Sequence, residues 1–200
     1  MINSKNLFLI ITAVILFYSC GKDDSQLADD NFEKGNYKKA IEQYTVFINV
    51  NPFHTKSIYN RGRAYEELGQ YDKAMADFQR VLEIDPKSVN AILSIGQYYH
   101  RKKNYEKALF YYDQAVEIDP NNYMAYYLRG RDRHLLGLVD DAMNDYNKSI
   151  NLKSDFGMVY LYRGALLLHL KRKSSACNDF LMAKNLEVEE ANEAYKKNCK

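Results

Sequence analysis

Four histidines are the residues best suited to chemistry in this 200-residue chain, and their spacing argues against a metal site. His100 and His134 are 34 residues apart, while His54 and His169 fall elsewhere in the sequence. A zinc ion needs three or four protein ligands in one place, and no further histidine or cysteine accompanies this pair. The sequence also shows no Ser-His-Asp or Cys-His arrangement, Gly-rich phosphate loop or pair of catalytic carboxylates. We therefore expect no metal, no cofactor, no small-molecule substrate and no enzymatic activity.

The composition favours a folded helical protein that does not bind nucleic acid. Hydrophobic residues make up 46% of the chain and there are only three prolines, so a helical core can form. The formal net charge is +2, without the clustered basic stripe that a nucleic-acid ligand requires. Eighteen tyrosines are present, and we expect most of their rings to belong to the core.

Cys20 is the cysteine that the sequence connects with a membrane. It follows Ser19 and an apolar run at residues 7–18. This run is shorter than the about 20 residues of a spanning helix and fits the apolar region of a secretory signal. The Ser-Cys junction resembles a bacterial lipoprotein signal, which implies that residues 1–19 are removed and that Cys20 is lipidated. A permanent anchor helix is the alternative.

The residues after Cys20 bear on where the protein is displayed. Lys22, Asp23 and Asp24 resemble the short acidic tag of lipoproteins on the surface of some Gram-negative bacteria. A solvated linker is the alternative. The resemblance implies the bacterial cell envelope, as an outer-membrane lipoprotein, with surface exposure if the tag operates.

A 34-residue period organises the remainder of the chain and must position any functional residue. One small residue recurs in every unit, at Ala40, Ala74, Ala108, Ala142 and Ala176. One aromatic residue does the same, at Tyr44, Phe78, Tyr112, Tyr146 and Phe180. The predicted units are residues 21–54, 55–88, 89–122, 123–156 and 157–190.

Each unit is predicted to form two antiparallel helices. In residues 55–88, apolar residues at helical spacing are interrupted by Gly69 and resume at Ala74. The pattern resembles the tetratricopeptide repeat, from residue 21 to residue 190. The resemblance implies an all-α fold, an α-α superhelix or solenoid of five helical hairpins, with residues 191–200 as a capping helix. It also implies that the first helices line a concave groove that binds a protein or peptide.

The groove residues follow from the repeat slots that should point inward from the first helices. The predicted partner-binding residues are Lys56, Tyr59, Arg63, Asn90, Gln97, His100, Met124, Tyr127, Arg131 and His134. Tyr, Arg and Met are enriched at interface cores, so an extended peptide or an amphipathic helix suits this surface. A solvated wall without a specific partner is the alternative. Some members of the family clamp a terminal carboxylate, but only Asn60 matches those slots, so that ligand is disfavoured.

Two slots change together among the units, which predicts structural ion pairs within hairpins. Units two, four and five carry an arginine before the glycine and an aspartate before the second-helix aromatic. The predicted pairs are Arg61 with Asp77, Arg129 with Asp145 and Arg163 with Asp179. The third unit has Ile95 and Tyr111 instead. Because the paired positions lie equally far from the turn, they should face each other.

Two cysteines remain once Cys20 is lipidated. Cys177 belongs to the last unit and Cys199 to the predicted capping helix. Exported proteins retain disulfides, so we expect these two residues to be bonded. Two free thiols are the alternative.

These features favour a scaffold or adaptor that is anchored to a membrane through an N-terminal lipid and binds a protein or peptide. A structural spacer without a groove ligand is the first alternative. An envelope enzyme would require a site that the sequence does not show.

Overall fold

The computed structural model describes residues 24–199, so the predicted signal peptide and Cys20 lie outside the described residues. This part of the chain folds into eleven helices without a strand. It divides into two compact units, the first ending at Ile84 and the second beginning at Asp85. None of the helices in residues 24–199 combines the length and hydrophobicity needed to cross a bilayer.

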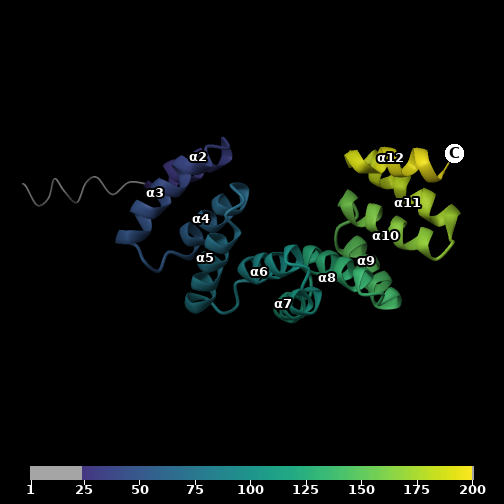
Figure 1. The fold of residues 1–200 in the computed structure, drawn as a ribbon, viewed down its shortest axis with the longest axis horizontal. Helices are drawn as coiled ribbons and strands as arrows, with labels where there is room; N and C mark the ends of the chain where they lie inside the picture. Colours follow the sequence, from purple (N-terminus) through teal and green to yellow (C-terminus); the bar gives the residue numbers. More distant parts are fainter. Residues whose placement is uncertain (1–23, 200) are drawn as a thin grey trace, which may run out of the picture. The chain divides into compact units, whose positions relative to one another are not determined.

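The first unit consists of two helical hairpins (Figure 1). Their helices are α2 (Asp24–Glu33), α3 (Tyr37–Val50), α4 (Thr55–Glu67) and α5 (Tyr71–Ile84). Helix α2 packs against α3, α4 packs against α5, and α3 contacts α4. The hairpins therefore stack in chain order.

The second unit consists of three hairpins and a final helix (Figure 1). Its helices are α6 (Val89–Arg101), α7 (Tyr105–Ile118), α8 (Tyr123–Leu135), α9 (Val139–Leu152), α10 (Gly157–His169), α11 (Lys173–Asn185) and α12 (Glu189–Asn198). Each hairpin pairs consecutive helices, and α12 packs on α11. The predicted all-α fold of five hairpins with a helix after the last one is confirmed.

Every hairpin turns at the same repeat slot, where the backbone is left-handed. Gly35, Gly69 and Gly137 have φ of 75°, 70° and 75°, and Lys103 and Lys171 have φ of 58° at the equivalent slot. A left-handed residue after the last helical turn lets the following N–H groups bond the free carbonyls of the helix end. Glycine does this without steric cost, whereas lysine is strained.

Small and aromatic residues of the period build the core. The recurring alanines and aromatics are all 0–2% exposed: Ala40, Ala74, Ala108, Ala142, Ala176, Tyr44, Phe78, Tyr112, Tyr146 and Phe180. A Cβ on Gly96 would lie 2.3 Å from Cε1 of Tyr112, and one on Gly164 would lie 2.7 Å from Cε1 of Phe180. In the second to fifth hairpins, a glycine on the first helix thus lets the aromatic ring of the second helix lie directly against the first-helix backbone.

An arginine and an aspartate face each other across three of the hairpins. In each pair, Nε and Nη2 of the arginine donate to the two carboxylate oxygens of the aspartate. The N–O distances are 2.8 and 2.6 Å for Arg61 with Asp77, 3.0 and 2.7 Å for Arg129 with Asp145, and 2.8 and 2.7 Å for Arg163 with Asp179. The aspartate side chains are 4–7% exposed, so these carboxylates need a charged partner within the fold, and in each hairpin the arginine supplies it.

The same arginines also reach the preceding hairpin. The third guanidinium nitrogen, Nη1, donates to a side chain on the second helix of the hairpin before. The contacts are Arg61 to Thr45 at 3.2 Å, Arg129 to Asp113 at 2.8 Å and Arg163 to Asn147 at 2.8 Å. Each arginine therefore connects three helices, which the sequence analysis did not anticipate.

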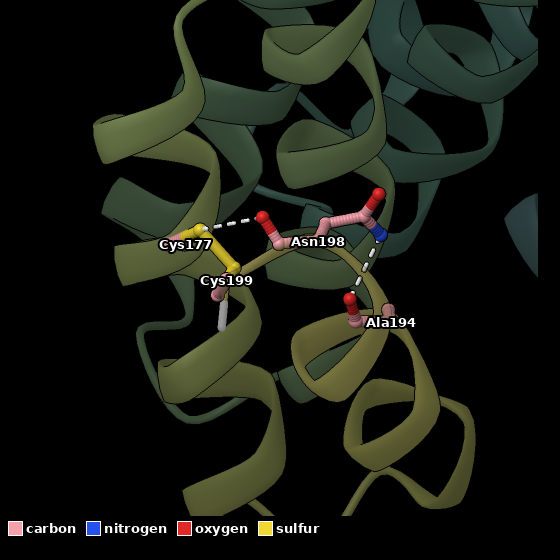
Figure 2. Close-up of a disulfide and its surroundings, with 4 residues drawn as sticks. All are labelled: Cys177, Ala194, Asn198 and Cys199. Carbon is pink, nitrogen blue, oxygen red and sulfur yellow. Dashed lines mark hydrogen bonds between the residues drawn. A yellow bond between two sulfur atoms is a disulfide. The ribbon is translucent and has the colours of Figure 1, made fainter.

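A disulfide fixes the last helix. Cys177 on α11 is bonded to Cys199, the residue after α12, with 5.6 Å between their Cα atoms (Figure 2). The side-chain amide of Asn198, the last residue of α12, donates to the Ala194 carbonyl at 2.8 Å, next to the disulfide (Figure 2). The expected disulfide is therefore present, and the final helix begins at Glu189, before the residue 191 predicted from sequence.

Candidate functional site

The first helices of neighbouring hairpins contact one another within each unit. Helix α2 touches α4 in the first unit, and α8 touches both α6 and α10 in the second. We call the surface of these helices the first-helix face. In the second unit it contains the predicted residues Asn90, Gln97, His100, Met124, Arg131 and His134.

In the first unit, the first-helix face is organised by Asp29 of α2. Its Oδ2 accepts from Lys56 Nζ at 2.7 Å, and its Oδ1 accepts from Asn60 Nδ2 at 2.9 Å and from the Tyr44 hydroxyl at 2.5 Å. A carboxylate that accepts several hydrogen bonds is stabilised in its charged form. Asp29 therefore joins α2 to α4 as well as to its own hairpin partner α3.

Two pKa shifts follow from this arrangement. Burial opposes ionisation of Asp29, but the hydrogen bonds from Lys56, Tyr44 and Asn60 outweigh it and lower its pKa. Burial and the hydrogen bond to Asp29 raise the pKa of Tyr44. Asn60, the one residue that matched a carboxylate-clamp slot, is thus already engaged by a carboxylate of the chain itself.

The other predicted residues of α4 are partly engaged. Lys56 remains 68% exposed despite its bond to Asp29. Arg63 Nε lies 3.3 Å from Glu66 Oε2, and the Tyr59 ring lies 5.5 Å from that of Phe78. Lys56 is therefore the predicted residue of this helix that offers the most surface to a ligand.

In the second unit, His100 is bound to a buried aspartate. His100 Nδ1 lies 2.6 Å from Oδ1 of Asp132, whose side chain is fully buried. His100 belongs to α6 and Asp132 to α8, so the contact ties together the first helices of two hairpins. The His100 side chain nevertheless remains 24% exposed, so part of it is accessible to a ligand.

Arg131 lies beside this pair with its guanidinium largely covered. The side chain is 15% exposed, its Nε is 3.5 Å from Asp132 Oδ1, and its Cζ is 5.9 Å from the Tyr127 ring centre. A guanidinium over an aromatic face is held by cation–π attraction. Arg131 therefore presents a fixed positive charge with a small accessible edge.

A buried polar cluster surrounds Arg131. Among the described residues, five buried side-chain atoms lack a hydrogen-bond partner: Nε and Nη2 of Arg131, Oδ2 of Asp132, and the hydroxyls of Tyr112 and Tyr146. Burial, followed by the charge of Asp132, raises the pKa of Tyr112 against the opposing effect of Arg131, and burial raises the pKa of Tyr146. Both hydroxyls are therefore protonated and available as hydrogen-bond donors at neutral pH.

The prediction that Tyr127 lines an open groove is wrong. Tyr127 is only 5% exposed, because the rings of Phe156 and Tyr162 pack against its ring, with centroid distances of 5.0 and 5.6 Å. Phe156 lies just before α10, so the following hairpin closes over Tyr127. The Tyr127 ring is part of the core, and the Arg131 guanidinium lies over its face.

The remaining predicted residues differ in accessibility. Asn90 is exposed, whereas Gln97, Met124 and His134 are half-buried. Burial and the neighbouring His169 lower the pKa of His134. Residues 24–199 contain no group of three or more His, Cys, Asp or Glu side chains arranged to hold a metal ion.

Three residues of this face were missed by sequence reasoning. Asp29 occupies the same repeat slot as Arg63 and Arg131, and this correspondence could have identified it. Asp132 follows Arg131 in its helix, and nothing in the sequence separates it from an exposed acid. Arg133 donates through Nη1 to Asp145 Oδ2 at 2.9 Å, a second cation for a carboxylate that we had paired with Arg129 alone.

Comparisons with known proteins agree with this fold. Residues 55–88 and 89–122 each match the family model of the tetratricopeptide repeat. The described helices thus define an all-α solenoid of tetratricopeptide type, and these two segments are repeats of that kind. No curated protein sequence matches the chain.

Three solved structures illustrate the likeness. The chain is similar to PilW, described as a widely conserved type IV pilus biogenesis factor, with a TM-score of 0.75, 20% identity, and coverage of 82% of this chain and 77% of that one. A thermophilic tetratricopeptide protein of Thermus thermophilus gives a TM-score of 0.71, 19% identity, and coverage of 86% and 95%. YrrB, described as having an unusual peptide-binding site, gives a TM-score of 0.65 and 16% identity, with coverage of 93% of this chain and 97% of YrrB.

Proposed function

We propose that this protein is a scaffold or adaptor that binds a protein or peptide on its first-helix face. The observation that carries the proposal is the contact of α8 with both α6 and α10, which joins three first helices into one surface. On that surface an exposed amide, Asn90, lies with half-buried Gln97 and Met124 and with the supported charge of Arg131. A fixed cation among amide and thioether groups suits a polypeptide ligand.

The proposal includes a membrane tether at Cys20. It is supported by the Ser-Cys junction and the short apolar run before it. PilW, with its role in pilus biogenesis, and YrrB, with its peptide-binding site, are fold relatives that make an envelope location and a peptide ligand reasonable expectations. We propose the outer membrane as the location of the tether.

Affinity purification from solubilised membranes tests the proposal, with variants that leave the core intact. The face variant carries Asn90→Glu and Gln97→Glu on α6. The control carries Gln114→Glu on α7 and Asn144→Glu on α9, which are second helices. The two variants are matched, because each changes one half-buried Gln and one exposed Asn to Glu.

The face variant is expected to lose a protein that the wild type and the control both retain, with all three showing equal thermal unfolding. If the face variant and the control capture the same proteins as the wild type, the chain is better explained as a structural spacer. The tether is tested by the mass of the mature N-terminal peptide, and Cys20→Ser is expected to abolish its acylation.

A further inference from the structure

The most exposed apolar side chains lie at one end of the first hairpin. Phe53, Val50 and Val46 are 77%, 75% and 60% exposed, the highest values among the large hydrophobic residues of the described chain. Val46 and Val50 are one helical turn apart on α3. Val46 lines a shallow depression with Leu27 of α2, which is 50% exposed, and with Glu42 and Gln43 at its edge toward the middle of α3. We call Leu27, Val46, Val50 and Phe53 the apolar end face.

At this face an apolar side chain occupies the slot in which three of the other first helices, α4, α8 and α10, carry a paired arginine. Leu27 occupies the repeat slot of Arg61, and Arg61 pairs with Asp77 and reaches back to Thr45 of the preceding hairpin. No hairpin precedes α2 within residues 24–199, and the slot holds an apolar side chain instead of a charged one. Residues 46–53 also contain no charged residue, although 27% of the chain is charged. The apolar end face therefore has the composition of a surface that is buried in contact with another apolar phase.

The short sequence separation between Cys20 and α2 bears on the occupant of the apolar end face. Helices α2 and α3 are antiparallel neighbours, so the start of α2 lies beside the C-terminal part of α3 (Figure 1). Asp24 and Val46 are equally far along the chain from the turn at Gly35. Cys20 is four residues before Asp24, and four residues span at most ~14 Å. An acyl chain on Cys20 would therefore hold this end of the hairpin against the bilayer surface.

We propose that the apolar end face enters the boundary between headgroups and acyl chains of the membrane that carries the tether. This inference rests on the proposed acylation of Cys20. Amphipathic surfaces at membranes bury apolar side chains about 5–10 Å into this boundary, a depth within reach of side chains beside the tether. The lipid chains hold the protein at the membrane, and burial of the apolar end face then fixes which side of the first hairpin meets the bilayer.

Tryptophan fluorescence tests the contact, since the chain contains no tryptophan. The acylated full-length protein carries Phe53→Trp or, as a matched control, Phe110→Trp on α7, where Phe110 is 58% exposed. Both proteins are reconstituted into vesicles of phosphatidylethanolamine and phosphatidylglycerol with brominated acyl chains. The Phe53→Trp protein should be quenched several-fold more than the control and emit at shorter wavelength. Adding Val46→Ser and Val50→Ser should reduce that quenching.

The outcomes separate this inference from the tether. A protein that floats with the vesicles while the Phe53→Trp and Phe110→Trp proteins are quenched equally overturns the inference and leaves the tether intact. A protein that does not float, with an unmodified Cys20 by mass, overturns the tether and the inference together. A short-wavelength Phe53→Trp emission that depends on protein concentration in detergent identifies a second copy as the occupant and also overturns the inference.

Discussion

Removing one arginine from an ion pair should cost much more in the last hairpin than in the one before it. Arg163 is the only side chain in the described residues that donates to Asp179. Asp145, in contrast, accepts from Arg129 and also from Arg133 at 2.9 Å. Arg163→Met therefore leaves a nearly buried carboxylate without a partner, whereas Arg129→Met leaves one that is still paired.

The expected magnitudes follow from burial and bond count. Breaking one side of a buried pair costs about 3–5 kcal/mol, and the 22% exposure of Arg163 places Arg163→Met near the lower limit, at about 3 kcal/mol. Arg129→Met should cost about 1.5 kcal/mol, the value of a hydrogen bond to a charged group. The two arginines are otherwise similar, because each reaches the preceding hairpin through Nη1 and each covers a tyrosine ring. The Nη1 partner of Arg129 is the charged Asp113 and that of Arg163 is the neutral Asn147, but Asp113 is 55% exposed, so this surface ion pair adds little to the cost of Arg129→Met.

Urea unfolding at neutral pH measures the difference, and amide hydrogen exchange localises it to α8–α9 or α10–α11. The double variant Arg163→Met with Asp179→Leu should recover most of the loss, because an apolar replacement removes the unpaired charge. Equal losses for the two arginine variants, or a larger loss for Arg129→Met, would refute the role assigned to Arg133.

Three further predictions concern the ends and turns of the hairpins. Cys199→Ser should release α12 and cost about 3 kcal/mol, from the separation of 22 residues to Cys177; reductant should lower the unfolding midpoint of the wild type and leave that of the variant unchanged. Lys103→Gly should stabilise by about 0.5–1 kcal/mol by relieving a left-handed lysine, and Gly137→Lys at the same slot should lower the thermal midpoint; a loss of stability from Lys103→Gly would contradict the strain. Burial and a neighbouring histidine lower the folded-state pKa of His134 below the ordinary 6.5. The unfolded chain therefore binds the proton first, and the free energy of unfolding should fall as pH drops below about 6.5. His134→Gln should weaken this pH dependence of the urea midpoint, and a variant with the same pH dependence as the wild type would contradict the role of His134.

The repeat made much of the fold predictable. Because each unit repeats the same small and aromatic slots, alignment of the chain with itself located the hairpins and the facing positions of Arg61 and Asp77. Cys177 and Cys199 could be paired because a capping helix after the last hairpin brings them together. These inferences succeeded because they depend on contacts between residues at fixed sequence separation.

The predicted binding face was less accessible to sequence reasoning. Tyr127 has the slot of a groove residue, but Phe156 and Tyr162 from the next hairpin cover it. His100 has the slot of a free ligand contact, but it binds Asp132. The expectation that most tyrosines are core was also too broad, since several half-buried rings instead make cation–π contacts with lysines. One example is Lys153, whose Nζ lies 4.7 Å from the Tyr123 ring centroid. Whether a side chain faces a ligand depends on neighbours from another hairpin, and a single repeat slot does not record them.

The sequence by itself determined the helical hairpins, their order, their turns and the residues that face each other within a hairpin, because the period sets the distance between those residues along the chain. Only the tertiary structure decided which first-helix residues remain accessible, since stacking of the next hairpin buries some and leaves others open. It also left Val46 and Val50 exposed on the C-terminal part of α3, which lies beside the start of α2 and so near the proposed tether. That position arises from antiparallel pairing and stacking in space, and it makes the first hairpin the proposed contact with the membrane.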